Sequence, residues 1–264
     1  MNYEIDASEL TAAQSKEKFD KHGFLCVRGL FSSDLVDKII SEAKSLSKED
    51  WEIERGGQST FLKRSDCSNL DFSGITYAQP ITSYLKTSHE LMGCELLNGA
   101  NHLLQINDAF YKGAEMHIRQ SGSNHLIPAH QDNFYFGLAS PRALTSYVYL
   151  TEQNRNNGAL GFLPTKLPSA TLDHELGMIE GFSSFNSIIE NKSDEFLYPS
   201  TQPGDVIFHH ASTFHRADSN KTLKSVASIS VRVFSRSFNK KDPLIQHKYS
   251  ENLQKNRRKT PFEG

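Results

Sequence analysis

The sequence predicts a mainly β protein, a sandwich or barrel with helices added at its N-terminal side, and three observations support this. Short runs rich in β-branched and aromatic residues follow one another after residue 100, separated by Gly, Pro, Asn and Ser. No helical pattern alternates with these runs, which argues against a parallel α/β sheet. A chain of 264 residues with 37% hydrophobic content is long enough to form one substantial core.

We therefore expect one domain over residues 1–264, with a mostly helical part at 1–100, a β core at 101–238 and a basic tail at 239–264. In this last segment Lys and Arg outnumber acidic residues, and we expect it to be a solvated tail.

The N-terminal part contains three helical stretches. The first runs from 11 to 23, where Thr and Gln at capping-box spacing predict its start and Gly predicts its end. A β-like run at 24–29 separates it from a second helix, which begins near residue 33 and places its apolar residues on one face. The third helical stretch covers 81–97. The polar segment 48–73 predicts a long surface loop, and such loops often carry selectivity.

The β core is expected to consist of the following runs: His102–Tyr111, Ala114–Gln120, Leu144–Thr151, Ala159–Pro164, Asp205–His210 and Val226–Phe234.

Composition argues against several classes of protein. The net charge of −2 gives no general electrostatic reason to bind nucleic acid or a membrane surface. Three cysteines without Cys-x-x-Cys spacing indicate neither a disulfide framework nor a thiolate zinc site. The chain shows no signal-peptide pattern and no apolar run long enough for a membrane span, so we expect cytoplasmic residence.

Two distant segments carry side chains that bind metals. His130 and Asp132 form a His-x-Asp triple, and His215 follows a predicted strand about eighty residues later. With 11 histidines and 31 acidic residues, about one His-x-acid triple is expected by chance, so the triple alone is weak. On a strand, however, residues two apart share a face, so both side chains could bind one ion.

Two histidines and one carboxylate on one face of an octahedron are typical of non-heme Fe(II) oxygenases, because three positions stay open for an oxo acid and dioxygen. His209 and His210 are alternatives to His215. Both follow Phe208 directly, where a histidine is more often a hydrogen-bonded core group than a ligand, so we favour His215.

Several motifs around these residues resemble the phytanoyl-CoA hydroxylase family of Fe(II)- and 2-oxoglutarate-dependent dioxygenases. The resemblance spans nearly the whole chain and rests on the segments 22–31, 129–132, 157–164, 203–208 and 215–222. It implies a double-stranded β-helix, the jelly roll of cupin-like proteins, with helices packed outside. It also implies iron held by His130, Asp132 and His215, 2-oxoglutarate as co-substrate, and a small organic substrate.

The chain departs from this family at two places. Pro164-Thr-Lys-Leu replaces the usual Pro-Gly-Ser-His, and Val226 stands where the family has the Arg that binds the far carboxylate of 2-oxoglutarate. A buried carboxylate without a cationic partner is costly, so another residue must supply the charge.

Strand geometry favours Lys224, two residues before Val226, over Arg232, about 20 Å along the strand. Arg119 and Arg142 are further candidates. The hydroxyl groups of Thr145, Tyr147 and Tyr149 could add hydrogen-bond donors for the co-substrate, although core packing is the simpler role for each.

The sequence thus predicts an iron and 2-oxoglutarate-dependent enzyme that oxidises a small metabolite or natural-product intermediate with O2. We expect Asn133, Phe134 and Phe136 to contribute to substrate binding because aromatic groups beside such ligands line pockets. Two alternatives stay open: an iron enzyme with another co-substrate, motivated by Val226, and a non-catalytic β-barrel that binds a metabolite.

Overall fold

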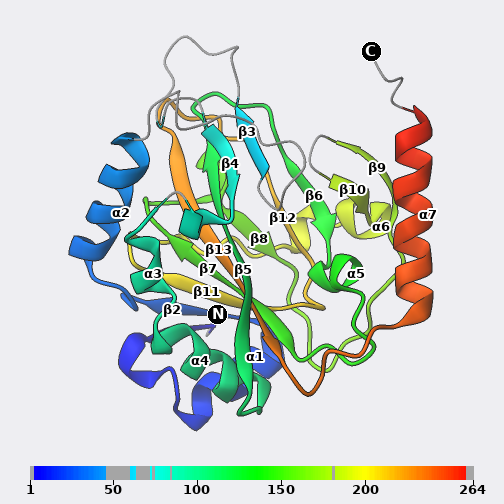
Figure 1. Ribbon diagram of the computed structural model, residues 1–264, viewed down its shortest axis with the longest axis horizontal. Helices are drawn as coiled ribbons and strands as arrows, with labels where there is room; N and C mark the ends of the chain where they lie inside the picture. Colours follow the sequence, from blue (N-terminus) through cyan, green and yellow to red (C-terminus); the bar gives the residue numbers. More distant parts are fainter. Residues whose placement is uncertain are drawn as a thin grey trace.

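The computed structural model describes residues 3–45, 60–63, 72, 75–83, 85–179 and 182–259. Within these residues the chain builds an eight-stranded sheet, a facing three-stranded sheet and a separate hairpin (Figure 1). In spatial order the large sheet contains β1 (Glu4–Asp6), β2 (Phe24–Arg28), β11 (Val206–His210), β7 (Ala143–Tyr149), β13 (Val226–Ser235), β5 (Ala109–Arg119), β4 (Ile75–Gln79) and β3 (Thr60–Lys63). The small sheet contains β6 (Ile127–His130), β12 (His215–Ala217) and β8 (Leu160–Phe162), and the hairpin pairs β9 (Glu175–Ile179) with β10 (Phe182–Phe185).

The outer face of the large sheet is covered by N-terminal helices. These are α1 (Ala13–His22), α2 (Ser33–Ser45), α3 (Ser88–Leu91) and α4 (Cys94–Leu104). Val148 and Val231 of the central strands share one buried cluster with Phe19 of α1, Ile39 of α2 and Leu103 of α4. Successive residues of a strand point to opposite faces of the sheet. The residues that alternate with these buried apolar ones therefore face the interior between the two sheets.

The inner face of the large sheet meets the small sheet through aromatic contacts. Phe24 of β2 stacks on Phe162 of β8 with ring centroids 4.9 Å apart, and His209 of β11 lies 4.4 Å from His215 of β12. Two facing sheets whose strands come from alternating parts of the chain form the double-stranded β-helix that the resemblance implies.

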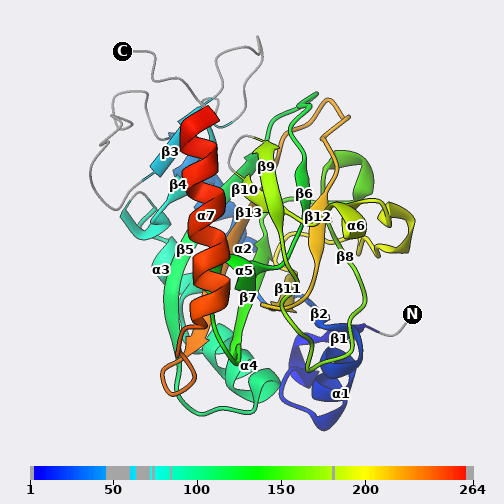
Figure 2. The same ribbon diagram turned by 90° about the vertical axis from the view of Figure 1, so that its right-hand side faces the viewer.

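The C-terminal segment differs from the expected solvated tail. Helix α7 (Pro243–Lys259) runs alongside β9 and β10 and packs on the short helix α5 (Asp132–Phe136), as Figure 2 shows. The buried side chain of Asn252 donates to the His174 carbonyl and to Ser184 Oγ. The many Lys and Arg residues of this segment are typical of a solvated chain, so its composition did not reveal that it packs against the fold.

Two boundaries also differ from expectation. Helix α1 begins at Ala13 without the predicted side-chain cap, and α4 continues to Leu104, inside the segment predicted as the first strand of the core. The predicted loop at 48–73 lies mostly outside the described residues, which contain only β3 and Phe72 of it. Short helices η1 (Ala7–Glu9), η4 (Ile81–Ser83), η5 (Arg155–Asn157), η6 (Ser193–Glu195) and α6 (Ser187–Glu190) complete the described fold. None of the helices described here is long and apolar enough to cross a membrane.

Candidate metal centre

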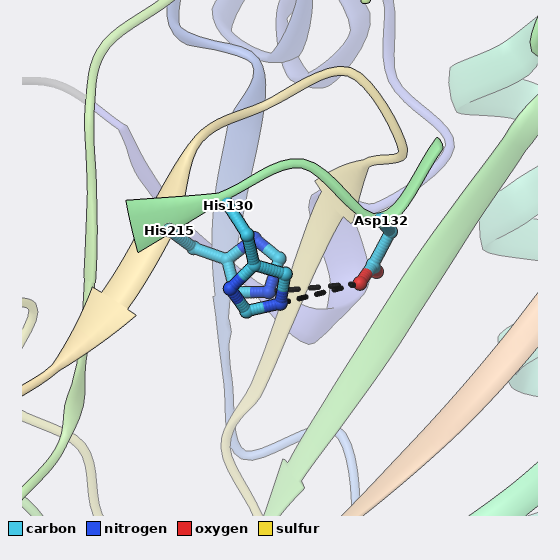
Figure 3. A group of neighbouring side chains, drawn as sticks. All are labelled: His130, Asp132 and His215. Atoms are coloured by element: carbon cyan, nitrogen blue, oxygen red, sulfur yellow. Dashed lines mark ion pairs between the residues drawn. The ribbon is translucent and has the colours of Figure 1, made fainter. Parts of the chain in front are cut away.

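The three predicted ligands come together where the small sheet meets α5. His130 is the last residue of β6 and Asp132 is the first residue of α5, so the two do not lie on one continuous strand as predicted. His215 opens β12 and is the antiparallel register partner of His130. Strand pairing therefore brings the two imidazoles together, and the turn into α5 directs Asp132 toward them (Figure 3).

The distances fit a single ion. Asp132 Oδ1 lies 3.9 Å from His130 Nε2 and 3.7 Å from His215 Nε2. One ligand atom from each residue lies within 4.8 Å of the others, and this is the group of candidate metal ligands found among the described residues. Tetrahedral or octahedral ions bind nitrogen and oxygen at about 2 Å, so ligand atoms this far apart can surround one ion.

Both imidazoles are oriented by backbone carbonyls. His130 Nδ1 lies 2.7 Å from the Pro128 carbonyl, and His215 Nδ1 lies 3.2 Å from the Thr213 carbonyl. Because a carbonyl only accepts, each Nδ1 carries the proton and each Nε2 presents a lone pair toward Asp132. Burial is the main cause that lowers the pKa of His130 to about 3 and that of His215 to about 4. Both rings are therefore neutral at pH 7, the state that binds metals.

The carboxylate of Asp132 is held by the large sheet. Thr145 Oγ1 donates to Asp132 Oδ2 at 2.6 Å, and His209 Nε2 lies 3.9 Å from the same oxygen. Burial opposes ionisation of Asp132, but the surrounding imidazoles and the Thr145 hydroxyl outweigh it and lower the pKa to about 2. Thr145, predicted as a co-substrate residue, thus contacts a metal ligand. His209 is the neighbouring group that the sequence interpretation placed outside the ligand set.

The turn between His130 and Asp132 is supported from behind by residues that sequence reasoning missed. The backbone N–H of Gln131 donates to His174 Nε2 at 2.9 Å. The side-chain amide of Gln131 donates hydrogen bonds to the carbonyls of Ala170 and Ser212. His174 in turn stacks on Phe134, and Asn252 of α7 donates to its carbonyl. No sequence spacing indicates this chain of contacts, since it joins four separate segments.

The structure separates the residues proposed for the co-substrate. Lys224 is exposed and precedes β13, which begins at Val226, so the argument from strand parity that favoured it does not apply. Arg119, at the end of β5, is the direct cross-strand partner of Val226. Arg119 Nη1 donates to the carbonyls of His125 and Asp218 at 3.1 and 3.3 Å. Arg142 instead donates to the Leu104 carbonyl near the outer helices.

The inner face between Arg119 and the metal ligands carries phenols and hydroxyls. Tyr147 and Tyr149 of β7 have ring centroids 5.4 Å apart, and Ser228 of β13 is hydrogen-bonded to Tyr147. Ser228 was missed, although its parity with Val226 places it on the same face of the strand.

The residues predicted for substrate binding have packing partners. Asn133 is buried and its amide donates to the Leu138 carbonyl and Thr171 Oγ1. Phe134 stacks on His174, and Phe136 packs on Phe234. Tyr135, in the same short helix, is the side chain whose ring meets His130, with centroids 5.6 Å apart. A role in substrate binding for Asn133, Phe134 and Phe136 therefore stays a prediction.

Comparisons with known proteins agree with this architecture. EctD from S. alaskensis, in its apoform, superposes with a TM-score of 0.67 at 19% identity, covering 88% of this chain and 79% of EctD. AviO1 from Streptomyces viridochromogenes Tue57 gives a TM-score of 0.67 at 14% identity, covering 87% of this chain and 97% of AviO1. The non-heme alpha ketoglutarate dependent epimerase SnoN from nogalamycin biosynthesis gives 0.61 at 19% identity, covering 87% and 80%.

At such identities these structures establish a shared fold. No match was found among the curated proteins. The family model described as phytanoyl-CoA dioxygenase (PhyH) matches residues 19–226, which is most of the chain and includes all three candidate ligands. This chain therefore belongs to the phytanoyl-CoA dioxygenase (PhyH) family.

Proposed function

We propose that this protein is an Fe(II)- and 2-oxoglutarate-dependent dioxygenase that uses O2 to oxidise a small organic molecule, with His130, Asp132 and His215 as its iron ligands. The observation that carries the proposal is the convergence of these three side chains, in their metal-binding protonation states, within a chain of the PhyH family. Two histidines and one carboxylate leave open positions for a bidentate oxo acid. The SnoN structure in complex with Fe3+ and alpha ketoglutarate, and the EvdO2 structure with 2-oxoglutarate, support the same pair of cofactors here.

We assign the far carboxylate of 2-oxoglutarate to Arg119. Directly opposed residues of an antiparallel pair have Cα atoms about 4.5–5.5 Å apart and side chains on the same face. A guanidinium from position 119 therefore borders the space that an Arg at position 226 would occupy. Among the described residues no carboxylate lies within ion-pair distance of Arg119, and its guanidinium donates to the neutral carbonyls of His125 and Asp218. Its charge is accordingly available for an anion.

The surroundings of Arg119 fit a bound carboxylate. Within the part of the chain that the structure describes, the buried hydroxyl of Tyr149 has no hydrogen-bond partner. An unpaired buried hydroxyl costs about 1–3 kcal/mol, so a ligand oxygen at this point would satisfy it. Gly158 makes room for the arginine, because a Cβ there would lie 2.6 Å from Arg119 Cδ. The absence of a side chain at Gly158 thus allows the Arg119 side chain to lie at this position.

When bound, iron and 2-oxoglutarate supply the oxidising power of the reaction. The residues of this chain hold and orient these groups. Hydrogen bonds from Nδ1 to backbone carbonyls fix the ring orientations of His130 and His215. A hydrogen bond from the Thr145 hydroxyl fixes the carboxylate of Asp132. The aromatic residues that pack between the sheets exclude water from the inner end of the site.

The test is succinate formation by iron-loaded protein supplied with 2-oxoglutarate and a broad panel of small organic substrates. We expect 2-oxoglutarate to be converted to succinate only after admission of O2. Asp132→Ala should abolish the conversion, whereas Lys224→Gln should leave it unchanged. Succinate formation that persists in Asp132→Ala, or failure of the wild type to bind iron and 2-oxoglutarate together, would contradict the proposal.

A further inference from the structure

A second polar group lies on the inner face of the large sheet, outside the metal ligands and away from Arg119. It consists of Tyr77 of β4, Glu115 and His117 of β5, and Ser230 and Arg232 of β13, and we refer to it as the Glu115 cluster. Arg232 Nη2 forms an ion pair with Glu115 Oε1, and His117 Nε2 lies 3.5 Å from Glu115 Oε2 and 3.1 Å from Ser230 Oγ. The Tyr77 ring meets the His117 ring edge-on, with centroids 5.3 Å apart.

The cluster adjoins the metal centre. Arg232 is the cross-strand partner of Thr145, whose hydroxyl donates to Asp132 at 2.6 Å. His117 stacks on Tyr147 with centroids 5.7 Å apart. Val226, which pairs with Arg119, lies six residues before Arg232, about 20 Å along the strand. The two arginines therefore occupy opposite ends of the inner face, with Arg232 at the end beside the metal ligands.

Two side chains of the cluster are more exposed to solvent than the two histidine ligands. The side chain of Arg232 is 31% exposed and that of His117 is 25% exposed, whereas those of His130 and His215 are 6% and 7% exposed. Solvent thus reaches Arg232 and His117 more readily than the two histidine ligands.

The contacts of the cluster determine which chemistry it offers. Both oxygens of Glu115 already have partners, one in Arg232 and the other in His117. The oxygen of Gln79 accepts from the Tyr77 hydroxyl at 2.8 Å and lies 3.5 Å from Arg232 Nη2. Within the described residues, Arg232 Nε is buried without a hydrogen-bond partner. The acceptors are thus occupied, and Arg232 Nε is the guanidinium donor that the described residues leave unpaired.

The position of the guanidinium is fixed by the fold. A Cβ at Gly113 would lie 2.9 Å from Arg232 Nη2, so the guanidinium occupies the space above this glycine. Glu115 holds it there through the ion pair. A guanidinium held in place with an unpaired N–H binds a ligand carboxylate more strongly than the corresponding neutral amide of the ligand, because the hydrogen bond to the carboxylate is charge-assisted.

We propose that the Glu115 cluster is the substrate subsite of this enzyme and that Arg232 binds a carboxylate of the small organic substrate while the metal centre acts on another part of the same molecule. This inference rests on the proposed function. Glu115 is a positioning residue in this arrangement, because it acts through Arg232.

The test compares carboxylic acids with their primary amides, which share shape but not charge. Benzoate, phenylacetate and 3-phenylpropionate would each be titrated beside the matching amide into protein loaded with Co(II) and 2-oxoglutarate, with calorimetric or NMR readout. We expect at least one acid to bind about 10-fold or more tightly than its amide, since hydrogen bonds to charged groups exceed neutral ones by a kcal/mol or more. Arg232→Gln should remove this preference, Glu115→Gln should reduce it, and Arg236→Gln should retain it because Arg236 is exposed and lies beyond β13.

Binding of Co(II) and 2-oxoglutarate is measured first in every variant. If the wild type does not bind them, the proposed function fails. If it binds them but acids and amides bind alike, or no acid binds, or Arg232→Gln keeps the preference, the subsite is wrong. A loss of 2-oxoglutarate affinity in Arg232→Gln equal to that in Arg119→Gln would also overturn it, since Arg232 would then belong to the co-substrate site.

Discussion

Replacing Arg119 by Gln should weaken 2-oxoglutarate binding while leaving iron binding intact. Arg119 is the cross-strand partner of Val226, and its guanidinium interacts electrostatically with Tyr147 and Tyr149. A hydrogen bond to a charged group contributes about 1.5–3 kcal/mol, so its loss corresponds to a Kd about 10- to 150-fold higher. Arg119→Lys should give an intermediate loss, because lysine keeps the charge without the bidentate geometry.

The cross-strand pairing also provides a rescue experiment. In Arg119→Gln combined with Val226→Arg, the cation returns to the same face from the neighbouring strand, and we expect most of the lost affinity to return. Anaerobic calorimetry of 2-oxoglutarate into metal-loaded protein measures each Kd, and circular dichroism confirms the fold. Lys224→Gln is the matched control and should bind like the wild type. If Arg119→Gln binds normally and Lys224→Gln does not, the assignment of the carboxylate to Arg119 is refuted.

Three further predictions concern the supports of the site and the cysteines. Thr145→Val should weaken Fe(II) binding by about 10- to 100-fold, as expected for removal of a group that orients a ligand such as Asp132, and an unchanged metal Kd would exclude this role. Asn252→Ala should lower the free energy of unfolding by about 1–3 kcal/mol, because two buried hydrogen bonds are lost, and urea unfolding that matches the wild type would contradict the stabilising role of these bonds. Iodoacetamide should label exposed Cys94 in the native protein but not Cys26, since burial raises the pKa of the Cys26 thiol to about 12. Peptide mass spectrometry identifies the labelled cysteine, and labelling of Cys26 in the native protein would contradict its burial.

Much of the fold and of the metal centre could be predicted because the residues that form them show recognisable local patterns in the sequence. Strands β7, β8, β11 and β13 carry branched and aromatic residues between turn formers, and their observed bounds agree with prediction to within one or two residues, whereas the short strands β6, β9, β10 and β12 were not predicted. His130, Asp132 and His215 were found through motifs around them, although their convergence depends on a strand pairing that no single motif specifies.

The errors have physical reasons. Lys224 was favoured because a strand was assumed to continue through it, whereas the chain there forms a turn in which Asn220 Nδ2 donates to the Lys224 carbonyl. Arg119 could not be ranked above it, because the register of β5 against β13 is a long-range property. Helix α7 was missed because tertiary contacts, such as those of Asn252, stabilise a segment whose composition is that of a solvated chain.

The central claim is that His130, Asp132 and His215 bind one iron ion, and an anaerobic Fe(II) titration tests it most directly. We predict one equivalent of Fe(II) bound per chain in the wild type and a loss of binding in His130→Ala, Asp132→Ala and His215→Ala, each with native circular dichroism. Folded variants that still bind one equivalent with wild-type affinity would contradict the account.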